Sequence, residues 1–227
     1  YDIDGDGFNE VLTVMDKKFK ILDGKTSKEK KSFDLPNPNA HDAIAIANFS
    51  GKTKPQDIVI KDRYRNVWGV DNEFKPLWTY RGNPGHYPWP YDFNGDGWPD
   101  ILVYGFPGKE AAWYENPKNT EGLWNRHVIL DVLDNESPGF ADVTGDGKPE
   151  IICCSGGYMG YAQADWKKPD APWTFHPITA KGDYQRFTHG IGVGDVNGDG
   201  RIDFLEKDGW WEQPAKLSGD PVWVKHA

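Results

Sequence analysis

The residue pattern best suited to chemistry in this 227-residue sequence is an aspartate-rich loop of nine residues that occurs four times. Each copy has oxygen-bearing side chains at positions 1, 3, 5 and 9 and glycines at positions 4 and 6. Side chains at this alternating spacing can turn toward one point, where the backbone carbonyl of position 7 can join them. Hard oxygen donors suit Ca²⁺ better than zinc or copper. The pattern therefore predicts four calcium-binding loops, with about four Ca²⁺ ions.

The expected metal ligands follow the same order in every copy. They are Asp2, Asp4, Asp6, Phe8 and Glu10; Asp92, Asn94, Asp96, Trp98 and Asp100; Asp142, Thr144, Asp146, Lys148 and Glu150; and Asp195, Asn197, Asp199, Arg201 and Asp203. Position 7 offers only its backbone carbonyl, so its side chain is free to vary from copy to copy.

A degenerate fifth copy begins at Asn48, continues through Ser50 and reaches Asp57 after one extra residue. Its Lys52 occupies position 5, where an ammonium group can replace the charge of the metal. We expect no ion in this loop.

Two other interpretations of these loops must be weighed. An EF-hand also begins with alternating aspartates, but it needs a bidentate Glu at position 12 and flanking helices. Position 12 is Thr13, Val103, Cys153 or Glu206, so only the last copy meets the first requirement. Ordinary turns are rich in Asp and Gly as well. Four copies in one register favour a metal-binding repeat over both alternatives.

The elements that must position these loops are short strands. The copies begin at residues 2, 48, 92, 142 and 195, a period of 44 to 53 residues that matches a four-stranded propeller blade. Each loop is followed by an apolar, β-prone run such as 101–104. Most loops are also preceded by a run of this kind, such as 43–47. A Trp-x-x-His pattern at 124–127, 173–176 and 223–226 indicates a further strand downstream.

These features predict an all-β fold: a β-propeller of four-stranded antiparallel blades with five visible repeats, forming a single domain over residues 1–227. The first repeat lacks the inner strand that precedes the other loops. We therefore expect a segment of a longer propeller. The alternative is a five-bladed ring that closes imperfectly or is closed by another chain.

Composition excludes several classes of function. Aromatic residues make up 14% of the sequence, which is too many for a disordered chain. The net charge is −9 and there is no long basic run, so we expect no nucleic-acid partner. No apolar stretch is long enough to span a bilayer. Cys153 and Cys154 are adjacent in a predicted strand, and we expect buried thiols.

The acidic loops resemble the FG-GAP or VCBS-type repeat of integrin-like propellers, and the resemblance extends over essentially the whole chain. It implies that calcium sits in the hairpin between the innermost and second strands, where its role is structural. We expect a secreted, periplasmic or cell-surface protein, because weak calcium sites fill at the millimolar calcium found outside the cytoplasm. The family is used for adhesion, for glycan binding and as the body of some secreted polysaccharide lyases and sugar dehydratases. Fold alone does not choose among these activities.

A second set of residues could carry chemistry at the channel mouth of such a propeller. Histidines precede three inner strands, and tyrosine and arginine side chains accompany them: His41, His86, His189, Tyr87, Tyr184 and Arg186. Arginine could neutralise a sugar carboxylate, histidine could remove the α-proton and tyrosine could protonate the leaving oxygen. The histidines could instead bind a transition metal, or the set could be polar channel lining or a passive sugar-binding surface.

Two functions follow from these residues. The first is an extracellular, calcium-stabilised propeller that binds carbohydrate or a protein ligand, with an additional propeller segment as a further possible partner. The alternative is a polysaccharide lyase or sugar dehydratase that acts by β-elimination.

Overall fold

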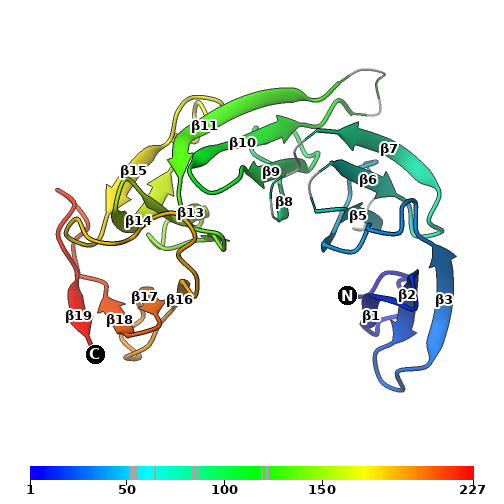
Figure 1. Cartoon of the computed structure of the whole chain (residues 1–227), viewed down its shortest axis with the longest axis horizontal. Coiled ribbons are helices and arrows are strands. Elements are labelled where there is room, and N and C mark those ends of the chain that lie inside the picture. Colours follow the sequence, from blue (N-terminus) through cyan, green and yellow to red (C-terminus); the bar gives the residue numbers. More distant parts are fainter. Residues whose placement is uncertain (52–55, 64, 83–84, 86, 119, 121–122) are drawn as a thin grey trace. The chain divides into compact units, whose positions relative to one another are not determined.

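The structure, a computed structural model, describes residues 1–51, 56–63, 65–82, 85, 87–118, 120 and 123–227. All regular secondary structure in these residues is β-strand (Figure 1), and they contain no helix. The all-β prediction is confirmed. Without flanking helices, the EF-hand interpretation of the acidic loops is excluded.

The strands form five antiparallel sheets, each a simple meander in chain order. The first sheet has three strands, β1 (Glu10–Met15), β2 (Lys18–Asp23) and β3 (Glu29–Asp34). The second contains β4 (Ala43–Ala47), β5 (Asp57–Lys61), β6 (Asn66–Val70) and β7 (Pro76–Arg81), and the third β8 (Pro88–Tyr91), β9 (Asp100–Tyr104), β10 (Lys109–Glu115) and β11 (Asn125–Leu133). The fourth contains β12 (Gly139–Ala141), β13 (Glu150–Ser155), β14 (Tyr158–Gln163) and β15 (Thr174–Pro177), and the fifth β16 (Gly192–Gly194), β17 (Asp203–Glu206), β18 (Gly209–Glu212) and β19 (Val224–His226).

This order is the predicted blade: strand, acidic loop, strand, strand, strand. The loops at 92–99, 142–149 and 195–202 each join the first and second strands of a sheet. The first sheet has three strands, and the loop at 2–9 leads into the first of them. The repeated sheets confirm a propeller-like fold.

The chain is divided into two compact units. The first contains Tyr1–Val103 and Trp113–Arg126, and the second contains Tyr104–Ala112 and His127–Ala227. The assignment of residues 1–227 to a single domain stays a prediction.

Apolar clusters between successive sheets form the core of each unit. In the first unit, Phe19 of β2 packs in one cluster with Ile58 and Ile60 of β5. In the second unit, Cys154 of β13 packs in another with Phe204 of β17. Cys153 and Cys154 are both buried and free, as predicted. Burial of these alternating side chains holds neighbouring sheets together and fixes which faces of the strands point inward.

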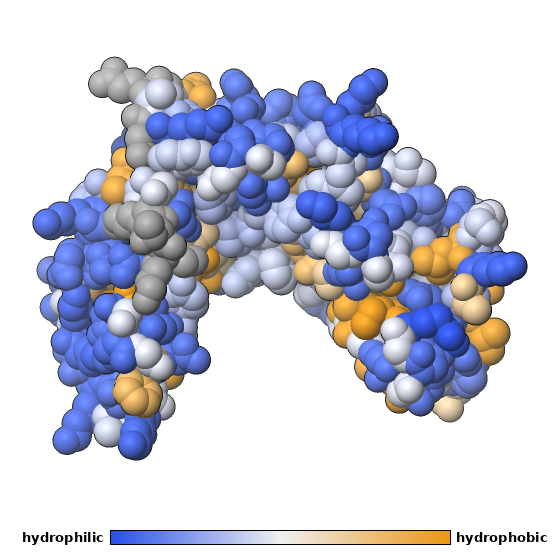
Figure 2. Space-filling view, turned by 180° about the vertical axis from the view of Figure 1, so that it is seen from behind, coloured by the Kyte–Doolittle hydropathy of each residue, from blue (hydrophilic) through white to orange (hydrophobic). Residues whose placement is uncertain are grey.

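The face shown in Figure 2 is mostly hydrophilic, with scattered apolar patches. Among the described residues, no helix is long and apolar enough to cross a bilayer.

Candidate metal loops and an aromatic pocket

The first aspartate of each complete loop shapes the loop by accepting backbone N–H groups. In the third loop, Asp142 Oδ1 accepts from Gly145 N at 2.8 Å, and Oδ2 accepts from Gly147 N at 2.9 Å. Both glycines have positive φ angles, of 75° and 83°, which a side chain would disfavour. Asp2 and Asp195 make corresponding bonds in their loops. Asp92 accepts from Gly97 N in the same way, and its Oδ1 accepts from Asp96 N. The loop conformation is therefore encoded by its own residues.

The aspartate at position 5 holds the residue at position 7. Its Oδ1 accepts the N–H of that residue at 2.8–2.9 Å in all four complete loops, where the donors are Phe8, Trp98, Lys148 and Arg201. The contact uses only the backbone of position 7. This explains physically why four different side chains are accepted there.

The carboxylate at position 9 is buried in every complete loop. Asp100, Glu150 and Asp203 are fully buried, and Glu10 is 3% exposed. Each accepts the N–H of position 2, as when Glu150 Oε2 accepts from Val143 N at 2.8 Å. Burial raises the pKa of Asp100 to about 7 and also raises the pKa of Glu150. A buried carboxylate of this kind calls for a cation nearby.

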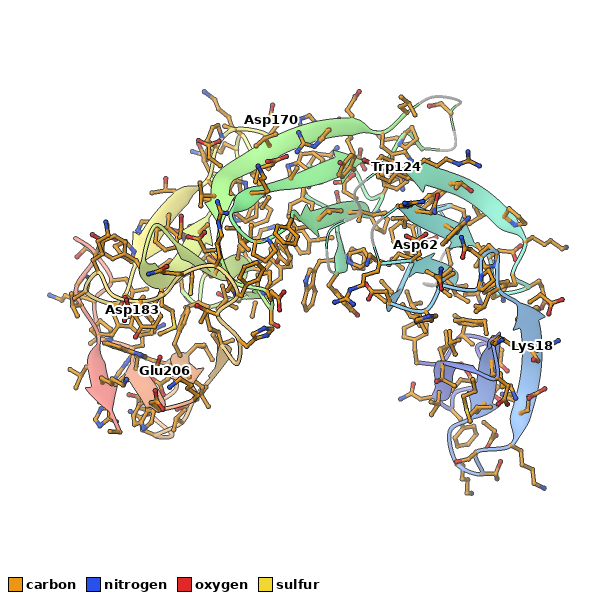
Figure 3. The ribbon with its side chains drawn as sticks, in the orientation of Figure 1. Lys18, Asp62, Trp124, Asp170, Asp183 and Glu206 are labelled. Carbon is orange, nitrogen blue, oxygen red and sulfur yellow. The ribbon has the colours of Figure 1, made fainter. Side chains whose placement is uncertain are left out.

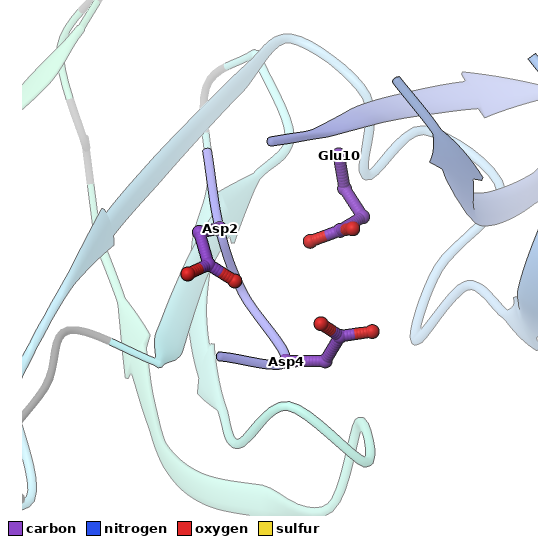
Figure 4. Close-up of side chains that lie close together, drawn as sticks. All are labelled: Asp2, Asp4 and Glu10. Carbon is purple, nitrogen blue, oxygen red and sulfur yellow. The ribbon is translucent and has the colours of Figure 1, made fainter. Parts of the chain in front are cut away.

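Two loops bring three carboxylates together. Oxygens of Asp2, Asp4 and Glu10 lie within 4.8 Å of one another (Figure 4), as do oxygens of Asp142, Asp146 and Glu150. Each group combines a buried carboxylate with more exposed ones, all of them hard oxygen donors. These donor sets fit Ca²⁺. Occupancy of the twenty predicted ligand positions stays a prediction.

Basic side chains also reach the acidic loops. Lys30 Nζ lies 2.7 Å from Asp4 Oδ2, 3.0 Å from Asp6 Oδ2 and 2.9 Å from Glu10 Oε1. Lys118 Nζ lies 2.8 Å from Asp96 Oδ2 in the second loop.

In the fourth loop, Arg201 pairs with Asp199. In the degenerate copy, Asp57 accepts the backbone N–H of Ser50 at 2.7 Å and its hydroxyl at 2.6 Å. Lys52 lies outside the described residues, so its predicted role in this copy stays untested.

Three of the predicted catalytic residues lie on the segment between β15 and β16, in the second unit. His189 Nε2 is 2.6 Å from Glu136 Oε2, which orients the imidazole. Burial and the neighbouring Glu206 raise the pKa of Tyr184 to about 12. The Arg186 guanidinium lies directly against Gly108, where an added Cβ would be 2.1 Å from Arg186 Nε.

The other predicted catalytic residues belong to the first unit. His41 and Ile44 line the same cavity, and Tyr87 Oη donates to the carbonyl of Ile44 at 3.2 Å. His86 lies outside the described residues. The convergence of His41, His86 and His189 at one channel mouth therefore stays a prediction.

The first unit also contains an aromatic pocket that the sequence did not predict. The pocket has a volume of about 310 Å³. Its lining residues are Val67, Trp78, Thr79, Tyr80, Pro88, Ile101, Val103, Tyr114, Leu123, Trp124 and Arg126. Trp124 is labelled in Figure 3. Its ring centroid lies 5.1 Å from that of Trp78, and the hydroxyls of Tyr80 and Tyr114 are 3.5 Å apart.

The pocket combines an apolar wall with a polar end. Trp78 packs directly against Gly69 of β6, where an added Cβ would be 2.2 Å from the indole. At the polar end, burial and the hydrogen bond to Tyr80 raise the pKa of Tyr114 to about 12, while Arg126 opposes the rise. The sequence signal was present in Trp78 and Tyr80, which are two residues apart in β7. Such spacing puts side chains on one face of a strand.

Comparison with known proteins supports the repeat architecture. Residues 92–153 match the family model of the FG-GAP-like repeat. The crystal structure of the V. cholerae biofilm matrix protein Bap1 is similar at a TM-score of 0.52 and 18% identity, over 85% of this chain and 29% of that one. A lectin from Agrocybe aegerita, described as recognising non-reducing terminal N-acetylglucosamine, has a TM-score of 0.49 and 16% identity, over 87% of this chain and 60% of the lectin.

No curated protein sequence matches the chain. The chain spans less than a third of the length of Bap1, and at 18% identity the likeness shows the fold alone. The family match falls on the second complete loop and the third, together with the strands between them. The chain is therefore an all-β protein of repeated antiparallel sheets that carries an FG-GAP-like repeat at residues 92–153.

Proposed function

We propose that the chain is an extracellular carbohydrate-binding module in which calcium is structural and the aromatic pocket of the first unit receives the sugar. The observation that carries the proposal is the composition of that pocket. Trp78, Tyr80, Tyr114 and Trp124 supply ring surfaces, and two tyrosine hydroxyls and Arg126 supply polar groups at one end.

A sugar ring matches this division of the pocket. One face of a pyranose presents C–H groups that pack on aromatic rings, and its edge presents hydroxyls that need donors and acceptors. The volume of about 310 Å³ is at the lower end of the range for small-molecule pockets. The pocket therefore suits a short glycan segment better than a folded protein ligand.

The proposed role of calcium is to balance the buried carboxylates at position 9. A cation at that point would tie the loop to the strand that follows it, since the position-9 residues Glu10, Asp100, Glu150 and Asp203 begin β1, β9, β13 and β17. Weak sites of this type fill at millimolar calcium, as found outside cells. This supports an extracellular location.

The test is binding of the purified chain to a panel of neutral and acidic glycans, followed by calorimetry with the best ligand. Trp124→Ala should weaken binding about tenfold or more, a loss of about 1.4 kcal/mol. The matched control is Trp166→Ala, which removes the same side chain from a partly exposed position in the second unit. Absence of binding across the panel, or equal affinity for wild type and Trp124→Ala, would contradict the proposal. Thermal melts of both variants show whether each is folded.

One observation favours the alternative, a lyase that acts by β-elimination. His189, oriented by Glu136, lies on the same short segment as Tyr184 and Arg186. Elimination creates a conjugated double bond, so incubation with uronic-acid polysaccharides would raise ultraviolet absorbance. A rise that His189→Ala abolishes and Trp124→Ala leaves intact would favour the lyase over the binding module.

A further inference from the structure

Lys30 contacts more of the first acidic loop than a surface ion pair would. Its ammonium lies within 3.0 Å of one oxygen from each of Asp4, Asp6 and Glu10, which are positions 3, 5 and 9 of the loop. An ammonium group has three N–H donors, so each carboxylate can accept one. The side chain thus occupies the point toward which a metal's ligands would turn.

We infer that Lys30 is the built-in cation of the first acidic loop, so that this loop is held together without a metal and the chain binds three calcium ions instead of four. The inference rests on the proposed role of calcium in the other three complete loops.

The backbone aims Lys30 at the loop. In the pairing of β2 with β3, Ile21 is opposite Lys31 and Leu22 is opposite Glu29, which leaves Lys30 as the extra residue of a β-bulge. A bulge changes the direction of the side chain at the extra residue. The alternation of β3 is thereby interrupted at the one position whose side chain reaches the acidic loop.

The ion pair between Lys30 and Glu10 matters most, because Glu10 is buried. The Glu10 side chain is 1% exposed, whereas that of Lys30 is 26% exposed. A buried carboxylate without a cation is costly, and the Lys30 ammonium balances it within hydrogen-bond distance. A calcium ion entering this loop would have to displace the ammonium or lie beside a like charge.

The other complete loops differ in this respect. Lys118 pairs with Asp96 and Arg201 pairs with Asp199, both at position 5. Among the ion pairs of the described residues in these four loops, Lys30 alone reaches a position-9 carboxylate. In the other three complete loops, the position-9 carboxylate can therefore be balanced by a bound calcium ion.

The experiment counts calcium ions bound to the full chain, by native mass spectrometry and by calorimetry with CaCl₂ after EDTA treatment. Lys30→Met removes the ammonium and keeps the apolar stem. Wild type should bind three ions and Lys30→Met four. The control is Lys118→Met, which removes a lysine that touches only position 5 of its loop and should leave the count at three.

Each outcome separates the inference from the proposed function. Four ions in wild type, or three in Lys30→Met, overturns the inference and leaves the role of calcium standing. No calcium in any variant overturns the role of calcium itself. If Lys30→Met is unstable in EDTA, its recovery on adding CaCl₂ but not MgCl₂ supports the inference, and failure to recover counts against it.

Discussion

The buried carboxylate of Asp100 shows at the scale of one residue what an acidic loop requires. Its side chain accepts N–H groups from Phe93 at 3.0 Å and Asn116 at 2.8 Å, and both bonds favour the charged form. Burial outweighs them and raises the pKa to about 7, with Asp92 and Asp96 adding like-charge repulsion. Near neutral pH the metal-free loop is therefore divided between a protonated and a charged state.

The sign of the resulting pH dependence follows from the raised pKa. The native state without calcium binds a proton more tightly than the unfolded state, so this group favours folding at low pH. That contribution is fully present below the unfolded pKa of about 3.8 and is lost as the pH rises through about 7.

In EDTA, we expect the melting temperature of wild type to fall between pH 5 and 8 more steeply than that of Asp100→Asn, which cannot titrate there. Thermal melts at several pH values measure both slopes. Parallel slopes would show that Asp100 does not carry the effect. In saturating calcium, Asp100→Asn should be less stable than wild type, because it lacks a charged ligand for the ion.

Sequence reasoning reached the loop residues but not their distant partners. Positions 1, 3, 5 and 9 were assigned from spacing alone, because local hydrogen bonds shape each loop. Lys30 is 20 residues from Glu10 in the sequence. The direction of its side chain depends on a β-bulge that no residue pattern predicts. The aromatic pocket draws on segments from Val67 to Arg126, so it exists only after two sheets pack.

At the scale of elements, Gly160 shows how closely two outer strands approach each other. It lies in β14 opposite Pro177 of β15. A Cβ at this position would lie 2.2 Å from the carbonyl oxygen of His176 and 2.9 Å from the Phe175 ring. The nearest atom belongs to the backbone, so a side-chain rotation cannot relieve the clash.

Gly160→Ala should therefore lower the free energy of unfolding by about 1–3 kcal/mol, the usual cost of overpacking. For a chain of this size the melting temperature should fall by about 2–4 °C for each kcal/mol. Gly194→Ala is the matched control, since a Cβ in that strand meets no atom within 4 Å. It should be neutral or slightly stabilising. Equal melting temperatures for the two variants would mean that β15 can shift away from β14.

The order of the elements was predictable because each loop marks the start of a strand. The last residue of each complete loop is also the first residue of a strand: Glu10, Asp100, Glu150 and Asp203. The spacing of the predicted metal ligands therefore also predicted where these strands begin. The segment between β15 and β16 gave no such signal. It contains Tyr184, Arg186 and His189 without a regular strand, and the predicted convergence of histidines depends on its conformation.

For the whole molecule, calcium and the apolar clusters stabilise different contacts. The clusters join successive sheets within each unit, and each unit contains two of the complete acidic loops. The loops act within a sheet: those at 92–99, 142–149 and 195–202 connect its first and second strands, and the loop at 2–9 leads into the first strand of its sheet. Losing the metal should therefore weaken the individual sheets and leave the apolar contacts between them in place.

Calcium removal should accordingly lower the melting temperature without unfolding the chain at 25 °C. Extracellular sites of this type have dissociation constants of about 0.1–1 mM, so at 1 mM free calcium each filled site adds roughly 0.4–1.4 kcal/mol. Three sites would add about 1–4 kcal/mol, a shift of about 2–16 °C for a domain of this length. Differential scanning calorimetry in EDTA and in 1 mM CaCl₂ measures the shift.

MgCl₂ at the same concentration should restore little of the lost melting temperature, because Mg²⁺ demands octahedral geometry and gives up its water reluctantly. Identical melts in EDTA and CaCl₂ would show that backbone and side-chain bonds alone hold the loops, and the structural role of calcium would be wrong.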